Sequence, residues 1–115
     1  RQAVENTGLK SHSLSESVAR AKAENKKILV DVSAIWCGTC RKLDNEVFAK
    51  EEVKKVINEK YVFTRLEYES PEGEAFMRDH DVRSFPTLWM LDSDGKTMKR
   101  LQVTFEPKEF IEQIN

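Results

Sequence analysis

Residues 28–40 read Ile-Leu-Val-Asp-Val-Ser-Ala-Ile-Trp-Cys-Gly-Thr-Cys, and they decide how this chain of 115 residues folds. The first seven form a short, mostly apolar run rich in branched side chains, which predicts a buried strand covered on both faces. The last four place two cysteines three positions apart, between that strand and a segment with helical periodicity. The stretch therefore predicts a strand–turn–helix unit with a cysteine pair where the helix begins.

The flanking sequence continues this alternation of helices and strands. A Ser-x-x-Glu pattern at residues 13–16 begins a predicted helix that ends near Asn25, and residues 41–60 predict one long or broken amphipathic helix. Further along we expect strands at 61–69, 87–92 and 96–103, a turn at 93–95, and helices at 71–81 and 107–114. This order predicts an α/β fold with a mixed central sheet of about four to five strands and helices on both faces.

Length and composition favour one small domain with a well-solvated surface. Charged residues make up 34% of the chain, and nineteen basic against twenty acidic side chains leave a net charge of −1. This balance gives no electrostatic footprint for nucleic acid, and no apolar run is long enough to span a bilayer. We expect residues 1–12 to form a tail or linker and residues 13–115 to form a domain that is monomeric and not embedded in a membrane.

The two cysteines carry the chemistry, because they are the only ones in the chain. A cysteine where a helix begins lies beside unpaired backbone N–H groups, which lower a thiol pKa from about 8.5 toward about 7 or less. Cys37, the more exposed of the pair, is then the nucleophile. Cys40 follows one turn later, close enough to Cys37 to close a disulfide.

Three other interpretations of the pair stay open. The cysteines could form half of a zinc site with His12 and His80, although structural zinc sites favour a second closely spaced pair. They could be inert core residues, or the chain could be a catalytically silent binding module that keeps the motif. Gly38 and Thr39 suit a turn into a helix and not an apolar face, which argues against inert core residues, and the wide separation of the two histidines argues against zinc, so we expect redox chemistry and no metal.

Two separated motifs make the chain resemble the thioredoxin superfamily. One joins Val30 and Asp31 to the Cys-Gly-Thr-Cys run, and the other is Val-Arg-Ser-Phe-Pro-Thr at residues 82–87. The likeness covers nearly the whole chain from about Ser13. It implies a thioredoxin fold and a redox-active disulfide that needs no other cofactor. It also implies that the chain exchanges with protein thiols and disulfides, and that an upstream dithiol donor reduces it.

Within that superfamily the chain most resembles the C-terminal domain of the DsbD family, the bacterial transmembrane thiol:disulfide interchange proteins. The similarity lies in Asp44, four residues after the second cysteine, and in the runs at 46–48 and 52–53. Thioredoxin has a proline-kinked helix here, whereas this chain has no proline between 41 and 60. The likeness and the start at Arg1 favour a periplasmic or otherwise extracytoplasmic domain of a larger membrane protein. A small cytoplasmic protein is the alternative.

The resemblance also assigns roles to the buried acid and to the proline. Asp31 matches the acid that accepts the proton of the second cysteine, so we expect a general base for Cys40. The alternative is an aspartate on a partly exposed strand face. Pro86 matches a cis proline that presents the backbone of Phe85 to an extended substrate segment, with Thr87 beside it. The alternative is a trans proline at a strand start.

Other residues near the motif receive weaker assignments. Trp36 is expected to pack beside the cysteines and to bind substrate. Asp44 would add a second acidic influence on the thiols, and Arg65, at the place of a strand lysine, would tune Asp31. Ordinary surface charges explain both residues equally well. The loop at 103–106 lacks the glycine that thioredoxins carry after the last strand, which predicts a bulkier edge of the substrate groove.

The residues between the cysteines bear on the direction of exchange. They tune the reduction potential, and Gly38-Thr39 lacks the histidine of strongly oxidising family members. We therefore expect an enzyme, a thiol–disulfide oxidoreductase that reduces protein disulfides. A disulfide isomerase or oxidase, and a non-catalytic redox or metal-binding module, are the alternatives.

Overall fold

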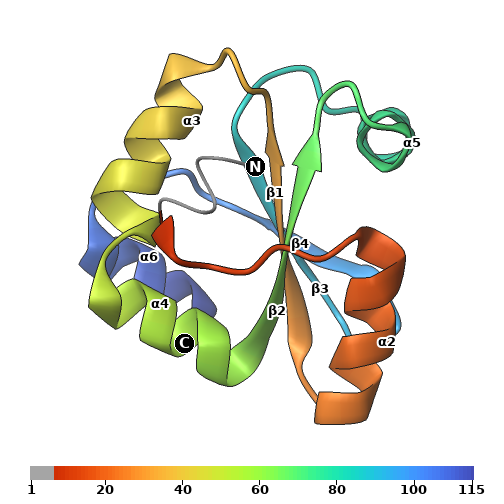
Figure 1. Ribbon diagram of the computed structural model, residues 1–115, viewed down its shortest axis with the longest axis horizontal. Helices are drawn as coiled ribbons and strands as arrows, with labels where there is room; N and C mark the ends of the chain where they lie inside the picture. Colours follow the sequence, from red (N-terminus) through yellow and green to blue (C-terminus); the bar gives the residue numbers. More distant parts are fainter. Residues whose placement is uncertain (1–6) are drawn as a thin grey trace.

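A four-stranded sheet lies between two layers of helices in the computed structural model, which describes residues 7–115 (Figure 1). The predicted elements are all present, within a few residues of the expected bounds. The strands are β1 (Lys27–Ser33), β2 (Tyr61–Glu67), β3 (Thr87–Leu91) and β4 (Thr97–Leu101). The helices are α2 (Leu14–Glu24), α3 (Gly38–Leu43), the π-helical turn η1 (Asp44–Phe48), α4 (Glu51–Lys60), α5 (Pro71–His80) and α6 (Pro107–Ile114).

The strand order is β2-β1-β3-β4, so the strand that leads into the cysteine pair lies inside the sheet. β1 pairs in parallel with β2 and antiparallel with β3, and β3 pairs antiparallel with β4. The predicted mixed sheet is thus confirmed, with four strands among the described residues. Because β1 is flanked on both sides, its polar residues Asp31 and Ser33 are buried in the middle of the domain.

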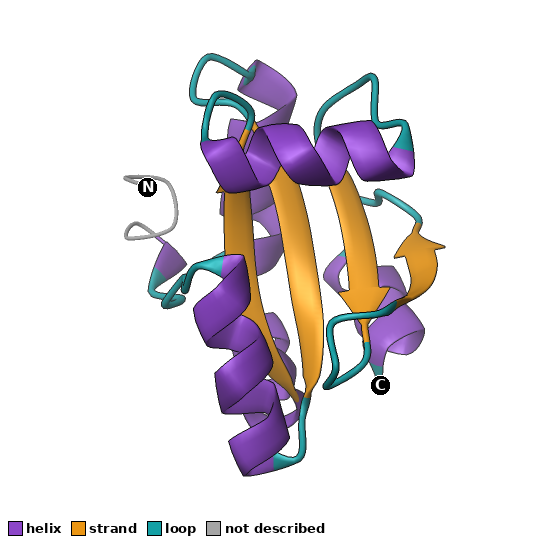
Figure 2. Ribbon diagram, turned by 90° about the vertical axis from the view of Figure 1, so that its right-hand side faces the viewer, coloured by secondary structure: helices purple, strands orange, loops and turns teal. Residues whose placement is uncertain are grey.

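The helices cover both faces of the sheet, as predicted. Figure 2 shows α2 and α5 crossing one face, and Figure 1 shows α3, α4 and α6 on the other. On the α2–α5 face, Val30 and Val32 of β1 pack with Phe76 of α5. On the other face, Leu29 packs with Phe48 and with buried residues of α4 and α6. Asp31 shares this second face with Leu29, because side chains alternate along a strand.

The helix termini follow from local sequence. Ser13 caps α2 through its hydroxyl, which accepts from the N–H of Glu16 at 3.1 Å. Ser70 caps α5 in the same way, with Pro71 in the first helical turn. These caps satisfy backbone donors that would otherwise lack partners, which is why short helices of modest amphipathicity begin at these residues.

The helical segment after the cysteines is broken. The sequence predicted either one long helix or a broken one over residues 41–60. A π-helical turn, η1, follows α3, and the chain becomes extended at Lys50 before α4 begins. Asp44 opens η1 and is buried, with 2% of its surface exposed. Its carboxylate therefore lies under the helix and not on the surface of the domain.

The segment before α2 contacts the edge strand β2. Leu9 is buried in the core, the N–H of His12 donates to the carbonyl of Phe63 at 3.2 Å, and Ser11 accepts from the N–H of Arg65 at 2.8 Å. The boundary predicted at residues 12–13 stays a prediction. Residues 1–6 of the expected tail lie outside the described residues.

Candidate functional site

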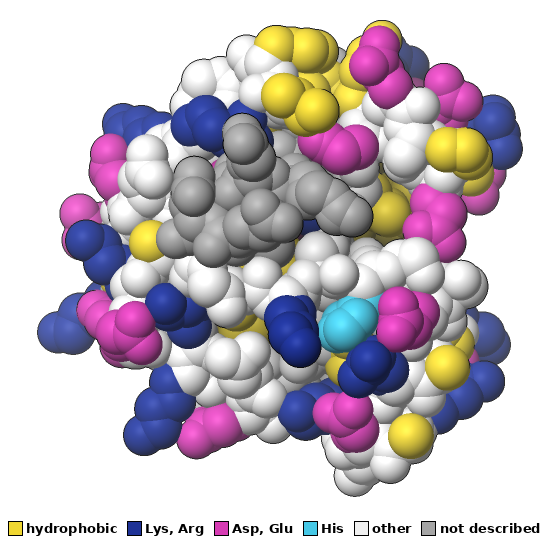
Figure 3. Space-filling model, viewed as in Figure 1, with side chains coloured by type: hydrophobic (Ala, Val, Ile, Leu, Met, Phe, Trp, Pro, Cys, Tyr) yellow, Lys and Arg dark blue, Asp and Glu magenta, His cyan; other side chains and the backbone are white. Residues whose placement is uncertain are grey.

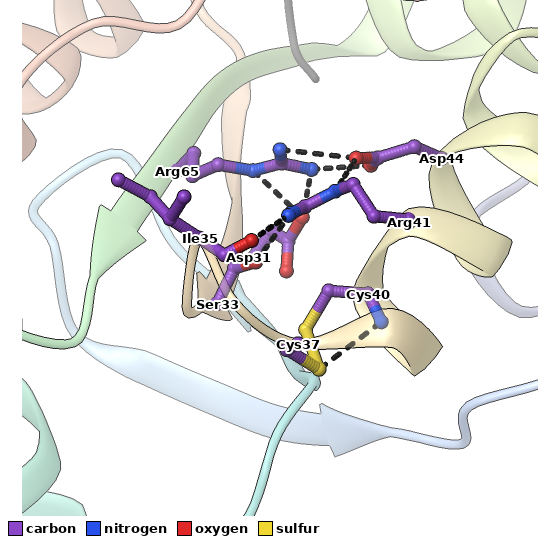
Figure 4. Close-up of a disulfide and its surroundings, with 8 residues drawn as sticks. All are labelled: Asp31, Ser33, Ile35, Cys37, Cys40, Arg41, Asp44 and Arg65. Carbon is purple, nitrogen blue, oxygen red and sulfur yellow. Dashed lines mark hydrogen bonds and ion pairs between the residues drawn. A yellow bond between two sulfur atoms is a disulfide. The ribbon is translucent and has the colours of Figure 1, made fainter. Parts of the chain in front are cut away.

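Cys37 and Cys40 form a disulfide at the start of α3 (Figure 4). Cys37 is the N-cap of the helix, and its Sγ accepts from the backbone N–H of Cys40 at 3.1 Å. Cys37 is 8% exposed and Cys40 2%, so Cys37 is the more accessible of the two. The N–H that contacts Cys37 Sγ would stabilise a thiolate there once the disulfide is reduced.

Asp31 lies on β1, the strand that leads into the cysteine pair, and is fully enclosed. Its side chain is 1% exposed and pairs with Arg65, the neighbour across from it on β2. The guanidinium Nη2 and Nε atoms of Arg65 donate to Oδ2 of Asp31 at 2.7 and 3.2 Å. This placement excludes the partly exposed strand face that was the alternative for Asp31.

Arg65 joins a second buried acid to the first. Its Nη1 atom donates to Oδ2 of Asp44 at 3.2 Å, and its Nη2 atom donates to Oδ1 of Asp44. The side chains of Arg65 and Asp44 are each 3% exposed, so neither is the surface charge that the sequence also allowed. One arginine thus links two carboxylates that come from different elements, β1 and η1.

Arg41, which follows Cys40 directly, extends this network toward the surface. Its Nε atom donates to Oδ2 of Asp44 at 3.4 Å, and its Nη1 atom donates to the carbonyl oxygen of Ile35. Its Nη2 atom lies 3.5 Å from Oγ of Ser33. Figure 4 shows the two arginines lying against Asp31 and Asp44, on one side of the disulfide.

The burial of this network displaces the pKa values of its members. Burial raises the pKa of Asp31 above its usual value of 3.8, although the charge and hydrogen bonds of Arg65 oppose this. Burial alone would lower the pKa of Arg65, but Asp31 and Asp44 raise it above its usual value. Arg65 therefore stays charged, while Asp31 binds a proton more readily than an aspartate in water.

One oxygen of Asp31 has no partner. Oδ1 is buried and makes no hydrogen bond, whereas Oδ2 accepts two from Arg65. In Figure 4 Oδ1, the oxygen without a dashed line, points away from Arg65, on the side where the disulfide lies. A buried carboxylate oxygen without a donor can accept a proton from a group close by. The structure thus holds a buried carboxylate oxygen without a hydrogen-bond partner on the strand that leads into the cysteine pair.

A cluster of three aromatic side chains begins beside the disulfide. Phe85 packs against the two cysteines and Ala34, and its ring centroid lies 5.7 Å from that of Trp36. Tyr68 contacts both rings edge to face, with centroids 5.4 Å from Phe85 and 6.1 Å from Trp36. Trp36 is 68% exposed. In Figure 3 hydrophobic side chains gather at the upper edge of the molecule, whereas charges of both signs are interspersed elsewhere.

The other predicted substrate-binding residues lie at the start of β3. The Phe85–Pro86 peptide bond is cis, as the resemblance implied. Thr87 is fully buried, and its hydroxyl accepts from Nε1 of Trp89 at 3.0 Å. The side chain of Thr87 therefore has no exposed surface to offer a substrate.

The loop at 103–106 contains one large side chain, Phe105. Phe105 is partly buried against the core, and Nζ of Lys42 lies 4.4 Å from the centroid of its ring. Lys42 belongs to α3, so this contact joins the loop to the helix that carries the cysteines.

The histidines considered for a zinc site have partners of their own. His12 lies 3.6 Å from Glu16, and His80 contacts the carbonyl of Phe76 and the hydroxyl of Thr97. Within residues 7–115, no three His, Cys, Asp or Glu side chains are grouped so that they could hold a metal ion. The same residues contain no helix long and apolar enough to cross a membrane.

Sequence reasoning missed Arg41, Tyr68 and Ile35. Arg41 could have been found, because it stands three residues before Asp44 and so shares a helix face with it. Nothing in the sequence distinguishes Tyr68 from other residues at the end of a strand. Ile35, which is 73% exposed, follows the apolar run at 28–34 directly, and nothing in the sequence marks its carbonyl as a contact of Arg41.

Comparisons with known proteins agree with the geometry. The sequence model of the thioredoxin-like domain family matches residues 14–115. The chain is 30% identical over 104 residues to UBX domain-containing protein 2 of Schizosaccharomyces pombe, covering 90% of this chain and 24% of that protein. It is 26% identical over 96 residues to the thiol:disulfide interchange protein DsbD of Actinobacillus pleuropneumoniae, covering 81% of this chain and 16% of that protein.

A solved structure shares the fold. The thioredoxin from Thermus thermophilus superposes with a TM-score of 0.82 at 21% identity, over 92% of this chain and 84% of that one. The expected thioredoxin fold and the similarity to DsbD are confirmed. The chain spans less than a quarter of the length of the two curated relatives described above. With the family model matched from α2 to the last residue, this chain belongs to the thioredoxin-like domain family.

Proposed function

We propose that this chain is a thiol–disulfide oxidoreductase that reduces protein disulfides through Cys37 and Cys40. The observation that carries the proposal is the pair itself: a disulfide at a helix start, preceded by a strand that holds a buried carboxylate with a free oxygen. The similarity to DsbD, whose name states thiol:disulfide interchange, supports the same chemistry. The redox-active group is the disulfide, so the reaction needs no further cofactor.

The first half of the reaction uses Cys37. In the reduced protein its thiolate attacks one sulfur of a substrate disulfide, and the other substrate sulfur leaves as a thiolate. A mixed disulfide between Cys37 and the substrate results. The N–H of Cys40, 3.1 Å from Cys37 Sγ, stabilises the attacking thiolate before this step.

The second half uses Cys40 and Asp31. Oδ1 of Asp31 accepts the thiol proton of Cys40, and the resulting thiolate attacks Sγ of Cys37. The bond from Cys37 to the substrate breaks, and the substrate leaves as a dithiol after protonation. Two electrons pass to the substrate, and the Cys37–Cys40 disulfide forms again. An upstream dithiol donor then returns the chain to its reduced state.

Protein segments are the substrate class that the surroundings favour. Phe85 packs against the disulfide, and Trp36 and Tyr68 pack edge to face against Phe85. An extended chain beside Phe85 and Pro86 would place its disulfide next to Cys37. We propose an extracytoplasmic location on the similarity to DsbD, with a cytoplasmic one as the alternative.

Reduction of insulin disulfides with dithiothreitol as reductant tests the proposal. Replacement of Cys37 by serine should abolish turnover above the rate of dithiothreitol alone. Replacement of Cys40 by serine should trap the mixed disulfide, which mass spectrometry detects. Undiminished turnover in the Cys37→Ser variant would contradict the assignment. The reduction potential of the pair separates a reductase from an oxidase or isomerase, which would have a potential well above that of thioredoxin.

A non-catalytic redox or binding module is the second candidate. The observation that favours it is the similarity to a UBX domain-containing protein, whose name states no thiol–disulfide activity. Such a module would bind partner proteins with both cysteines replaced by serine, and the wild-type chain would not accelerate insulin reduction. Zinc content after purification checks the metal-binding form of this candidate.

A further inference from the structure

Arg41 connects the loop that carries Cys37 to the buried acids. It is the residue after Cys40, and its side chain is 34% exposed, so it lies at the boundary between solvent and the buried network. Its three guanidinium nitrogens contact three acceptors that come from different segments (Figure 4). These acceptors are the carboxylate of Asp44, the carbonyl of Ile35 and the hydroxyl of Ser33.

The loop held by this arginine is otherwise exposed. Ile35 and Trp36 are 73% and 68% exposed, and both belong to the turn between β1 and α3. The other backbone contact across the turn runs from the N–H of Cys37 to the carbonyl of Ala34, at 3.0 Å. The bond from Arg41 to Ile35 therefore fixes the part of the turn that precedes the nucleophile.

The same arginine contributes charge to the network. Burial raises the pKa of Asp31, Arg65 opposes this most strongly, and Arg41 opposes it to a smaller extent. Asp44 acts in the other direction and raises the pKa of Asp31. Two carboxyl groups thus face two guanidinium groups, so loss of Arg41 leaves the carboxyl groups in excess.

Given the proposed dithiol exchange, on which this inference rests, we propose that Arg41 is a positioning residue for the reaction. Its planar, three-way contact ties the turn that precedes Cys37 to Asp44 and Ser33. A lysine cannot reproduce this contact, because an ammonium group is a single point of charge and not a fork. Substitution by lysine keeps the charge of Arg41 and removes its three-way contact, so the two effects can be measured separately.

Every charged group that faces Asp31 affects its pKa and therefore the expected pH dependence of the rate. Arg65 comes from β2, Asp44 from η1 and Arg41 from α3. Figure 4 shows the cysteines on the side of Asp31 away from Arg65, and Glu67 shares the sheet face of Arg65 two residues along β2. All of these remain in an Arg41 variant, so a change in its pH profile reports the loss of Arg41 alone.

The experiment measures insulin reduction from pH 5 to 9 for wild type, Arg41→Met and Arg41→Lys. Arg78→Met is the matched control, because Arg78 is 74% exposed on α5. We expect Arg41→Met to lower kcat about tenfold with little change in KM, the scale of one charge-assisted hydrogen bond. The rise of its rate with pH should also move to higher pH, because Asp31 must lose its proton before it can act as a base.

The lysine variant separates the effect of the contact geometry of Arg41 from the effect of its charge. Arg41→Lys should keep the wild-type pH profile, because the charge remains, and should still lose most of the rate at every pH. An Arg41→Met rate within twofold of wild type, or full rescue by lysine, would overturn the inference. If the wild-type chain shows no turnover, the proposed function itself fails, which is a distinct result. If Arg41→Met does not fold, the loss of rate in a folded Arg41→Lys variant decides the question alone.

Discussion

Arg65 holds Asp31 by one oxygen only: Nη2 and Nε both donate to Oδ2, at 2.7 and 3.2 Å, and Oδ1 has no partner. The arginine also contacts both oxygens of Asp44, so its own donors are occupied by two acids. This arrangement compensates the buried carboxylates electrostatically and still leaves one oxygen free. Structure and proposed chemistry therefore depend on the same ion pair.

Replacement of Arg65 by methionine should destabilise the domain severely. Two carboxylates would remain buried without their main counter-charge, and removal of one partner from a buried ion pair costs about 3–5 kcal/mol. Urea unfolding at pH 7 measures the loss. The matched control is Arg83→Met, because Arg83 is 82% exposed and its ion pair with Asp81 is solvated.

A compensating variant checks the cause of that loss. Arg65→Met combined with Asp31→Asn and Asp44→Asn removes the buried charges together, so it should recover part of the stability lost by Arg65→Met. If the triple variant is no more stable than the single one, packing of the arginine and not charge compensation explains the loss.

The stability of the domain should also depend on pH through Asp31. Burial raises the folded-state pKa of Asp31 above 3.8, so the folded state keeps this proton at pH values where the unfolded chain has lost it. The folded state then binds more protons, and stability falls as pH rises through this window. The stabilising contribution of Asp31 is fully present at pH values below its pKa in the unfolded chain. It is lost at pH values above its pKa in the folded state.

Comparison with Asp31→Asn isolates this contribution. The stability of wild type relative to Asp31→Asn should decrease as the pH rises from 4 to 8, because asparagine does not titrate. Urea unfolding of both proteins at several pH values gives this difference directly. A difference that is constant with pH, or that grows in favour of wild type, would contradict the raised pKa.

The sequence predicted the order of helices and strands because their signals are local. The Ser13 cap, the apolar run of β1 and the turn at 93–95 each act within a few residues, and all appear in the structure. Asp31 could be recognised because a charge inside an apolar strand requires a partner. The partner itself, Arg65, matched the lysine of a known family, but a surface position fitted it equally well.

The rest of the site depends on tertiary contacts that carry no local signal. Asp44 reads as a helix-surface acid, and only the π-helical turn at η1 and the position of β2 bury it against Arg65. Tyr68 reaches Trp36 and Phe85 because β2 ends beside the turn that follows β1. Such contacts between separate segments are set by how the elements pack, so sequence patterns do not specify them.

Gly73 should resist substitution, although it lies in a helix where alanine is intrinsically favoured. A Cβ at this position would lie 1.9 Å from the carbonyl oxygen of Glu67, which is backbone and cannot move aside easily. We expect Gly73→Ala to destabilise the domain by about 2–3 kcal/mol, measured by urea unfolding. Gly38→Ala is the control, since nothing lies within 4 Å of its Cβ. Equal stability of the two variants would contradict the predicted clash.

Trp36 should affect the reduction of proteins more than the stability of the domain. Its ring is 68% exposed, so Trp36→Ala should cost less than about 1 kcal/mol in urea unfolding. Loss of the ring removes apolar contact surface beside Cys37, so KM for insulin should rise severalfold, while the rate with a small disulfide stays the same. Met98→Ala is the control, because Met98 is 50% exposed on β4, away from the cysteines. Equal losses with insulin and the small disulfide would assign Trp36 to the chemistry of the pair, and unchanged kinetics would remove it from the substrate surface.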